Sequence, residues 1–295
     1  MTVKIGVNPL SWTNDDLPSL GSHIPLEQCL SEGKEAGYQG FELGNKFPRD
    51  PCVLQPLMQA YDLEIISGWF SLELLNNSVE SQIQKSQDHI KLLKAMNCTI
   101  FIACEVSGAI HSDINTPLSK SPRMNEQDWC RLTSRLNEFS DYLLSEGLQL
   151  AYHHHMGTVI ESEADVDRLM SSTSESVGLL LDTGHITYSG GSPLNLIDQF
   201  GGRICHVHCK DIRPQVLEES RREDWSFLNS VLAGVFTVPG DGFINYRELA
   251  VSLASINYSG WLVVEAEQDP SLADPFTYVS NGFQHLRNAV TEARL

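Results

Sequence analysis

Short apolar segments recur along the 295-residue chain, and each is followed by a polar turn and then by apolar residues at helical spacing. This alternation is typical of parallel strands that are buried on both faces and joined by crossover helices. The segments that fit strands are residues 3–8, 40–43, 64–69, 99–104, 149–153, 178–182, 203–210 and 261–265. Amphipathic segments between them include residues 26–36, 79–96, 126–146 and 163–171. The pattern predicts an α/β fold with eight strand–helix units.

Eight such units favour a single (β/α)8 TIM barrel over an open, doubly wound sheet. An open sheet normally has a Gly-rich phosphate-binding turn after its first strand, whereas residues 8–12 read Asn-Pro-Leu-Ser-Trp. No change of composition marks a boundary, so we expect one barrel domain over residues 1–295. The two longest connections, residues 105–125 and 211–245, follow strands and are expected at the carboxyl end of the barrel, where active sites lie.

Charge and composition exclude several classes of partner. The chain has 20 Lys and Arg against 38 Asp and Glu, a net charge of −18, and nucleic-acid binding needs a basic surface. No segment approaches the roughly 18 apolar residues of a membrane span, and residues 1–9 read as a strand rather than a signal peptide. We therefore expect a cytoplasmic protein without nucleic-acid or membrane partners. The seven cysteines, Cys205 and Cys209 among them, contain no CxxC pair and are expected to pack as reduced thiols.

Ionisable side chains stand at the ends of five of the apolar strands, where a buried strand has no structural use for them. They are Glu42 on the second strand, His153, His154 and His155 on the fifth, Asp182 (with His185 three residues later) on the sixth, His206, His208 and Lys210 on the seventh, and Glu265 on the eighth.

Asp182, His208 and Glu265 end three different strands, and the carboxyl ends of barrel strands meet at one rim. Taken alone, Asp182 could cap a helix and His208 could be a hydrogen-bonded core histidine. Glu265 follows three apolar residues, where a carboxylate costs several kcal/mol unless it is paired or metal-bound. Together they predict a shared divalent ion of the Mn, Co, Zn or Fe type, because the donors are N and O without thiolate.

The triple histidine is expected to supply a fourth group. Side chains alternate along a strand, so His153 and His155 face one way and His154 the other. We expect His153 as the fourth ligand, with His155 as the next choice. The same segment could instead transfer protons or form a solvated edge.

These segments resemble the sugar-phosphate isomerase/epimerase superfamily of metal-dependent TIM barrels, which includes the endonuclease IV family. Within it, the chain is most similar to the inosose dehydratase family of inositol catabolism. Residues 8–16, 40–44, 152–158, 181–185, 206–211 and 263–268 carry the resemblance. It implies a metal held by Asp182, His208 and Glu265, activity supported by Co or Mn, and sometimes a need for glutathione, which no residue here indicates independently.

The resemblance implies that isomerases and epimerases of the superfamily use two carboxylates, a Glu at the end of strand five and the Glu at the end of strand eight. This sequence departs from that pattern, because its strand five ends in histidines. Loss of one carboxylate favours a single deprotonation followed by departure of a leaving group, which is a dehydration. The expected substrate is 2-keto-myo-inositol, a cyclitol ketone. Glu265, His153 and His155 are candidates for the base or acid, and Lys210 could stabilise an oxyanion or be a surface lysine paired with Asp211.

The remaining polar and aromatic residues near the rim are candidates for substrate contacts. Glu42 could bind substrate hydroxyls or orient a metal ligand. His206 is also expected to bind substrate. Trp12 and Trp69 could stack on the ring of a cyclitol or simply pack. His185 could bind substrate, ligate the metal or support a ligand, and Glu267 is expected to be solvated.

Three rival functions remain open at this point. The first is a sugar or cyclitol isomerase or epimerase on the same barrel, and the second is a polyol-binding protein without activity. The third, a DNA repair nuclease, is disfavoured by the charge and by strands three and four, which end at Trp69 and Cys104 rather than at histidines. The oligomeric state is also open, and a homo-oligomer is compatible with the sequence.

Overall fold

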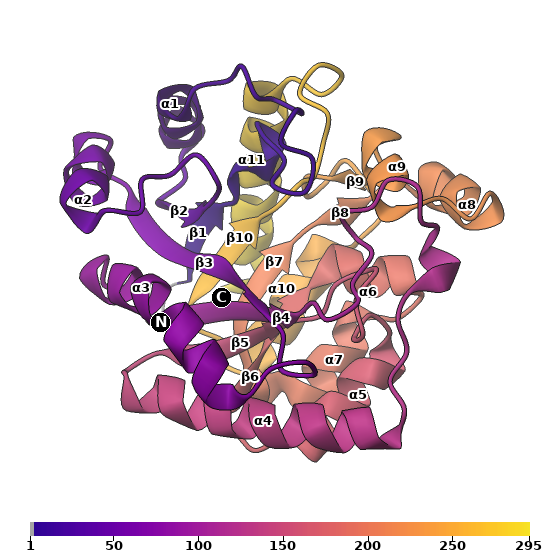
Figure 1. The fold of residues 1–295 in the computed structure, drawn as a ribbon. Coiled ribbons are helices and arrows are strands. Elements are labelled where there is room, and N and C mark those ends of the chain that lie inside the picture. Colours follow the sequence, from indigo (N-terminus) through magenta and orange to yellow (C-terminus); the bar gives the residue numbers. More distant parts are fainter. Residues whose placement is uncertain (1–2) are drawn as a thin grey trace.

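Eight parallel strands close into a barrel in the computed structural model, which describes residues 3–295 (Figure 1). They are β1 Lys4–Val7, β2 Gly40–Leu43, β3 Glu64–Leu72, β4 Ile100–Glu105, β5 Gln149–His153, β6 Val177–Asp182, β7 Ile204–Cys209 and β10 Trp261–Val264. The strands pair in chain order around the barrel, and β10 closes it by pairing with β1. The predicted (β/α)8 TIM barrel is confirmed.

Helices between the strands cover the outside of the barrel (Figure 1). They are α1 Leu26–Ala36, α2 Pro51–Ala60, α3 Val79–Ala95, α4 Glu126–Ser145, α5 Glu163–Ser172, α6 Thr183–Ser189, α7 Pro193–Phe200, α10 Tyr246–Ser255 and α11 Pro275–Ala293, with short 3-10 turns at Pro9–Ser11, Leu118–Lys120 and Gly201–Arg203. Asn125 and Ser162 form capping boxes at the starts of α4 and α5, which satisfies backbone N–H groups that a helix leaves free. No helix within residues 3–295 has the length and apolar character to cross a membrane.

The long connection after β7 contains a small folded unit rather than an open loop. It consists of β8 Asp211–Ile212, α8 Pro214–Arg222, α9 Phe227–Leu232 and β9 Phe236–Thr237, with β8 and β9 paired antiparallel. We call residues 211–237 the roof unit. Its apolar residues, Phe227 and Phe236 among them, form a separate core with Met156 and Tyr188. The unit therefore closes over the carboxyl ends of β5 and β6.

The strand register places the polar strand ends side by side. His208 on β7 is the register partner of Asp182 on β6 and of Val263 on β10. Below them, Ile100, Ile102, Ala151 and Leu180 fill the barrel interior. The carboxyl ends of β1, β4, β7 and β10 each differ by one residue from expectation, so that β10 stops at Val264, just before Glu265. The end of β3 differs most, because this strand continues to Leu72. The barrel is apolar in its middle and polar at its carboxyl end.

Candidate active site

Four buried side chains from four strand ends converge at the carboxyl end of the barrel: His153, Asp182, His208 and Glu265. One nitrogen or oxygen atom from each lies within 4.8 Å of the others. His153 Nε2 and His208 Nδ1 lie 3.4 Å and 3.5 Å from Asp182 Oδ2, and His208 Nδ1 also contacts Glu265 Oε2. We call these residues the four-residue cluster. The residues expected to share a metal are therefore adjacent in space.

The four-residue cluster has the chemistry of a metal site. His208 Nδ1 and Glu265 Oε2 are buried and in contact, yet neither has a hydrogen-bond partner of acceptable geometry. Buried polar atoms normally have such partners, and an ion that goes unseen is one common reason for an exception. Two imidazoles and two carboxylates suit divalent ions such as Zn, Mn, Co or Fe. These residues can hold one divalent ion.

Glu42 holds His208 from the side opposite to the cluster. Its Oε1 accepts hydrogen bonds from His208 Nε2 (3.1 Å) and His206 Nε2 (2.7 Å), and its Oε2 accepts from Asn8 Nδ2 (2.7 Å). Burial opposes ionisation of Glu42, but the charges and hydrogen bonds of His208 and His206 outweigh it and hold the pKa of Glu42 well below its usual range. A carboxylate behind a ligating imidazole fixes the orientation of the ring and raises its basicity. His206 lies beneath the site and contacts Glu42 rather than the cavity.

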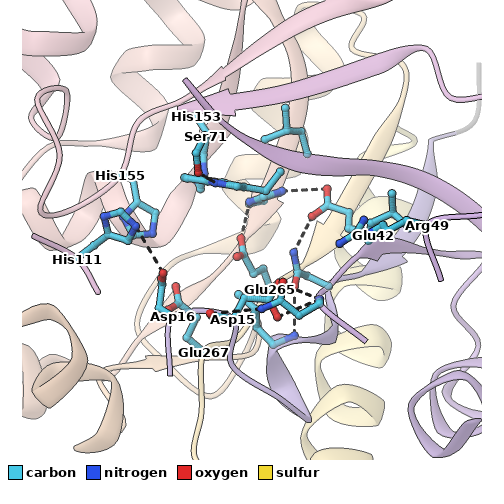
Figure 2. Close-up of a pocket in the computed structure, with 17 residues that line it drawn as sticks. Asp15, Asp16, Glu42, Arg49, Ser71, His111, His153, His155, Glu265 and Glu267 are labelled. Atoms are coloured by element: carbon cyan, nitrogen blue, oxygen red, sulfur yellow. Dashed lines mark hydrogen bonds and ion pairs between the residues drawn. The ribbon is translucent and has the colours of Figure 1, made fainter. Parts of the chain in front are cut away.

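A cavity of about 270 Å³ opens above the four-residue cluster (Figure 2). Its lining is mostly polar and consists of Asn8, Leu10, Asp15, Asp16, Glu42, Leu43, Asn45, Arg49, Trp69, Ser71, Ile102, His111, His153, His155, His208, Glu265 and Glu267. His153 and His155 line the cavity and His154 does not, as the strand alternation predicts. His154 instead accepts a hydrogen bond from the backbone N–H of Asp182 at 3.3 Å.

The rim of the cavity includes Asp15, Asp16 and His111, which the sequence analysis did not name as site residues, although it placed the connection 105–125 at this end of the barrel. Asp16 lies 3.5 Å from His111 Nε2, which joins the loop after β1 to the loop after β4. Asp15 accepts from the backbone N–H of Asn45 at 3.2 Å. Trp69 also stands at this rim, with its ring edge-to-face to His153 at 5.3 Å. The only sequence signal for Asp15 and Asp16 was their place in residues 8–16, which carry the superfamily resemblance.

Trp12 does not reach the cavity, so its expected role in stacking on the substrate is wrong. Trp12 follows the 3-10 turn at Pro9–Ser11 and is not among the residues that line the cavity. The indole is fully buried, donates to Glu32 Oε2 at 2.5 Å and packs on Phe41 at 5.8 Å between ring centroids. Trp12 therefore packs the first loop and α1 against β2.

Lys210 and Glu267 form a buried ion pair beside the four-residue cluster. Lys210 Nζ donates to Glu267 Oε1 at 2.6 Å, and both side chains are almost inaccessible to solvent. Of the two alternatives for Lys210, the surface lysine paired with Asp211 is wrong, because Lys210 is buried and Asp211 accepts from backbone N–H groups of Gly240 and Gly242 instead. The expectation of a solvated Glu267 is also wrong. Burial and the charge of Glu265 raise the pKa of Glu267 to about 7, against the opposing effect of Lys210.

His155 lines the cavity, and His185 lies behind it, against the roof unit. Their ring centroids are 3.9 Å apart, and Phe227 of the roof unit packs on both. Burial lowers the pKa of each imidazole well below its usual value, so both are neutral. His155 Nδ1 lies 2.8 Å from the carbonyl oxygen of Met156, which leaves Nε2 as a proton acceptor. His185 contacts Lys210 rather than the cavity.

Comparisons with known proteins agree with this geometry. Residues 30–289 match the family model described as xylose isomerase-like TIM barrel. The chain belongs to this family. The rhizopine catabolism protein MocC of Rhizobium meliloti is 44% identical over 99% of this chain and 90% of its own length. An inosose dehydratase of Geobacillus thermodenitrificans is 42% identical over 97% of this chain and 96% of its own length.

Two solved structures share the fold at low sequence identity. An L-ribulose 3-epimerase is 15% identical with a TM-score of 0.70 and covers 99% of this chain and 96% of its own. The IOLI protein, whose structure contains a zinc atom, is 16% identical with a TM-score of 0.67 and covers 99% of this chain and 98% of its own. The resemblance inferred from the sequence is thus confirmed at the level of family and fold.

Proposed function

We propose that the protein is a hydro-lyase that removes water from 2-keto-myo-inositol (scyllo-inosose) in myo-inositol catabolism. The product is a trihydroxycyclohexane-1,2-dione. The observation that carries this proposal is the 42% identity to an inosose dehydratase along nearly the full length of both chains. The polar cavity above the four-residue cluster supports it, because a cyclitol ketone presents hydroxyl groups on every side and one carbonyl group.

The proposal includes a divalent metal as cofactor, held by His153, Asp182, His208 and Glu265. When the ion is bound, Lewis-acid stabilisation of negative charge on the ketone oxygen becomes available. Manganese or cobalt is the proposed ion, with zinc or iron satisfying the same donors. A glutathione requirement stays a prediction from the family resemblance, since no described residue indicates it.

The side chains around the cavity can perform the proton transfers of such an elimination. A group must take the proton next to the carbonyl, and another must protonate the leaving hydroxyl. Glu267 and His155 line the cavity outside the four-residue cluster, and they can hold or accept a proton at a carboxylate oxygen and at Nε2. Glu42 orients His208, and Trp69 lines one side of the cavity. Glu265 belongs both to the cluster and to the cavity wall.

The proposal extends to partner and location. Five carboxylates line the cavity, at Asp15, Asp16, Glu42, Glu265 and Glu267, and Arg49 is the arginine among them. This lining favours an uncharged polyol and disfavours nucleic acid. A cytoplasmic location is supported by the seven cysteines, which form no disulfide within residues 3–295.

The test is mass spectrometry of 2-keto-myo-inositol after incubation in D2O with chelator-stripped protein, with and without added Mn or Co. The proposal expects loss of one water only when metal is present. An isomerase or epimerase would leave the composition of the substrate unchanged while introducing deuterium at carbon. A polyol-binding protein would leave the substrate unchanged with every metal, and either of these results would contradict the proposal.

A further inference from the structure

A second group of potential metal ligands lies directly beside the four-residue cluster. His155, His185 and Glu267 are buried, and one nitrogen or oxygen atom from each lies within 4.8 Å of the others. Such a neighbouring set of imidazole and carboxylate donors is what a two-metal centre requires. The barrel therefore contains donors for two adjacent cations.

The ammonium group of Lys210 lies among these donors. Nζ is 2.6 Å from Glu267 Oε1 and 3.0 Å from His185 Nε2. It is also 3.6 Å from Glu265 Oε1 and 3.7 Å from Asp182 Oδ2, the two carboxylates of the four-residue cluster. Lys210 thus contacts donors of both clusters, as a second metal ion in this position would.

The local structure holds Lys210 in this position. Thr183 Oγ1 accepts from the Lys210 backbone N–H at 3.0 Å and donates to its carbonyl oxygen at 2.9 Å. The Lys210 side chain passes directly over Gly184, where an added Cβ would lie 2.6 Å from Lys210 Cγ. The ring of Phe236 covers Nζ from the roof unit at 4.9 Å. The lysine is fixed at its backbone and enclosed along its side chain.

We propose that the Lys210 ammonium takes the place of a second metal ion and restricts this centre to one divalent ion. The inference rests on the metal centre of the proposed function. An ammonium group has three donors and no site to which an oxygen ligand can coordinate. Its single positive charge lies within 4 Å of the carboxylates of Asp182, Glu265 and Glu267, and it offers no second Lewis acid. The protein therefore lacks the second metal ion that a two-metal displacement, such as phosphoryl hydrolysis, requires.

The test is the number of Mn ions bound per chain, measured by elemental analysis and by electron paramagnetic resonance, which detects spin coupling between adjacent Mn ions. The wild-type protein is expected to bind one Mn. Lys210→Ala removes the ammonium and leaves its donors in place, so it is expected to bind two and to show the coupled signal. Lys210→Ala/Glu267→Gln lacks one donor of the second group and is expected to return to one. Lys4→Ala, which removes an exposed lysine, is the matched control and should stay at one.

Several results would overturn the proposal. They are two Mn ions on the wild-type protein, one Mn on Lys210→Ala at saturating metal, or two on the double variant. If Lys210→Ala is unfolded even in millimolar Mn while the double variant folds, the second ion fails to supply the missing charge and the proposal is wrong. If the wild-type protein and the Lys210→Ala variant each bind one Mn, only the role of Lys210 is contradicted. A wild-type protein that binds none contradicts the metal centre itself.

Discussion

Glu265 is the residue through which the four-residue cluster and the cavity are joined. It contacts His208 Nδ1, lies 3.6 Å from Lys210 Nζ and lines the cavity. Burial opposes its ionisation, but His208 and Lys210 outweigh this effect and lower the pKa of Glu265. The Glu265 carboxylate is therefore negatively charged. This charge attracts His208 and Lys210 and would also attract a bound cation.

We expect Glu265→Gln to abolish turnover and to weaken metal binding by more than the roughly 10- to 100-fold typical of groups that only support a ligand. The amide keeps the shape of the side chain and removes the charge. Bound Mn and the rate of water loss are the measurements, with Glu64→Gln, an exposed partner of Lys4, as the control. Turnover near the wild-type rate in the metal-loaded variant would contradict the assignment.

Replacing His153 and His154 separately tests which face of β5 supplies a ligand. His153 Nε2 lies 3.4 Å from Asp182 Oδ2, whereas His154 faces the backbone of β6. We expect His153→Ala to lose more affinity for Mn than His154→Ala, as measured by competition with a chelator of known affinity. The two variants are controls for each other. The opposite order would place the ligand on the other face of the strand.

At the scale of elements, the strand ends were predictable and the contacts between distant loops were not. Glu42, Asp182, His208 and Glu265 interrupt apolar runs, and that local signal locates them on the rim. The rim contact between Asp16 and His111 joins loops without periodicity. The Lys210–Glu267 pair spans 57 residues of sequence. Glu265 and Glu267 are two residues apart, the spacing at which side chains of a strand share a face, and both line the cavity although β10 ends at Val264.

The packing of α3 on the barrel includes a titratable group, His89. Its Nε2 lies 3.2 Å from the carbonyl oxygen of Gly68, and its ring packs against Phe70 and Phe101. Burial lowers the pKa of His89 to about 4, whereas an unfolded chain titrates near the ordinary value of about 6.5. As pH falls from about 6.5 towards 4, the unfolded state takes up the proton first, so this group reduces stability across that window.

We expect the wild-type protein to lose up to about 3 kcal/mol more unfolding free energy than His89→Gln between pH 7 and pH 4. Glutamine keeps a donor for the Gly68 carbonyl and does not titrate in this range. Chemical denaturation at the two pH values measures the difference, and His23→Gln, at an exposed histidine, should follow the wild-type protein. Parallel losses in wild type and His89→Gln would show that His89 is not buried as described.

At the scale of the whole molecule, closure of the barrel is what creates the site. Glu42 and His208 are separated by 166 residues and meet at 3.1 Å because β2 and β7 point into the same end of the barrel. The sequence predicted this convergence through the fold class. It could not predict that Trp12 does not line the cavity or that the roof unit buries Lys210, since both depend on how loops pack after the barrel has closed.

The most direct test of this account is a titration of the chelator-stripped protein with Mn, in which water loss from 2-keto-myo-inositol is followed against Mn added per chain. We expect no activity without metal, a linear rise, and a plateau at one Mn per chain that is absent in Glu265→Gln. Full activity in the metal-free protein, or a plateau that Glu265→Gln also reaches, would contradict a dehydration that depends on one ion held by His153, Asp182, His208 and Glu265.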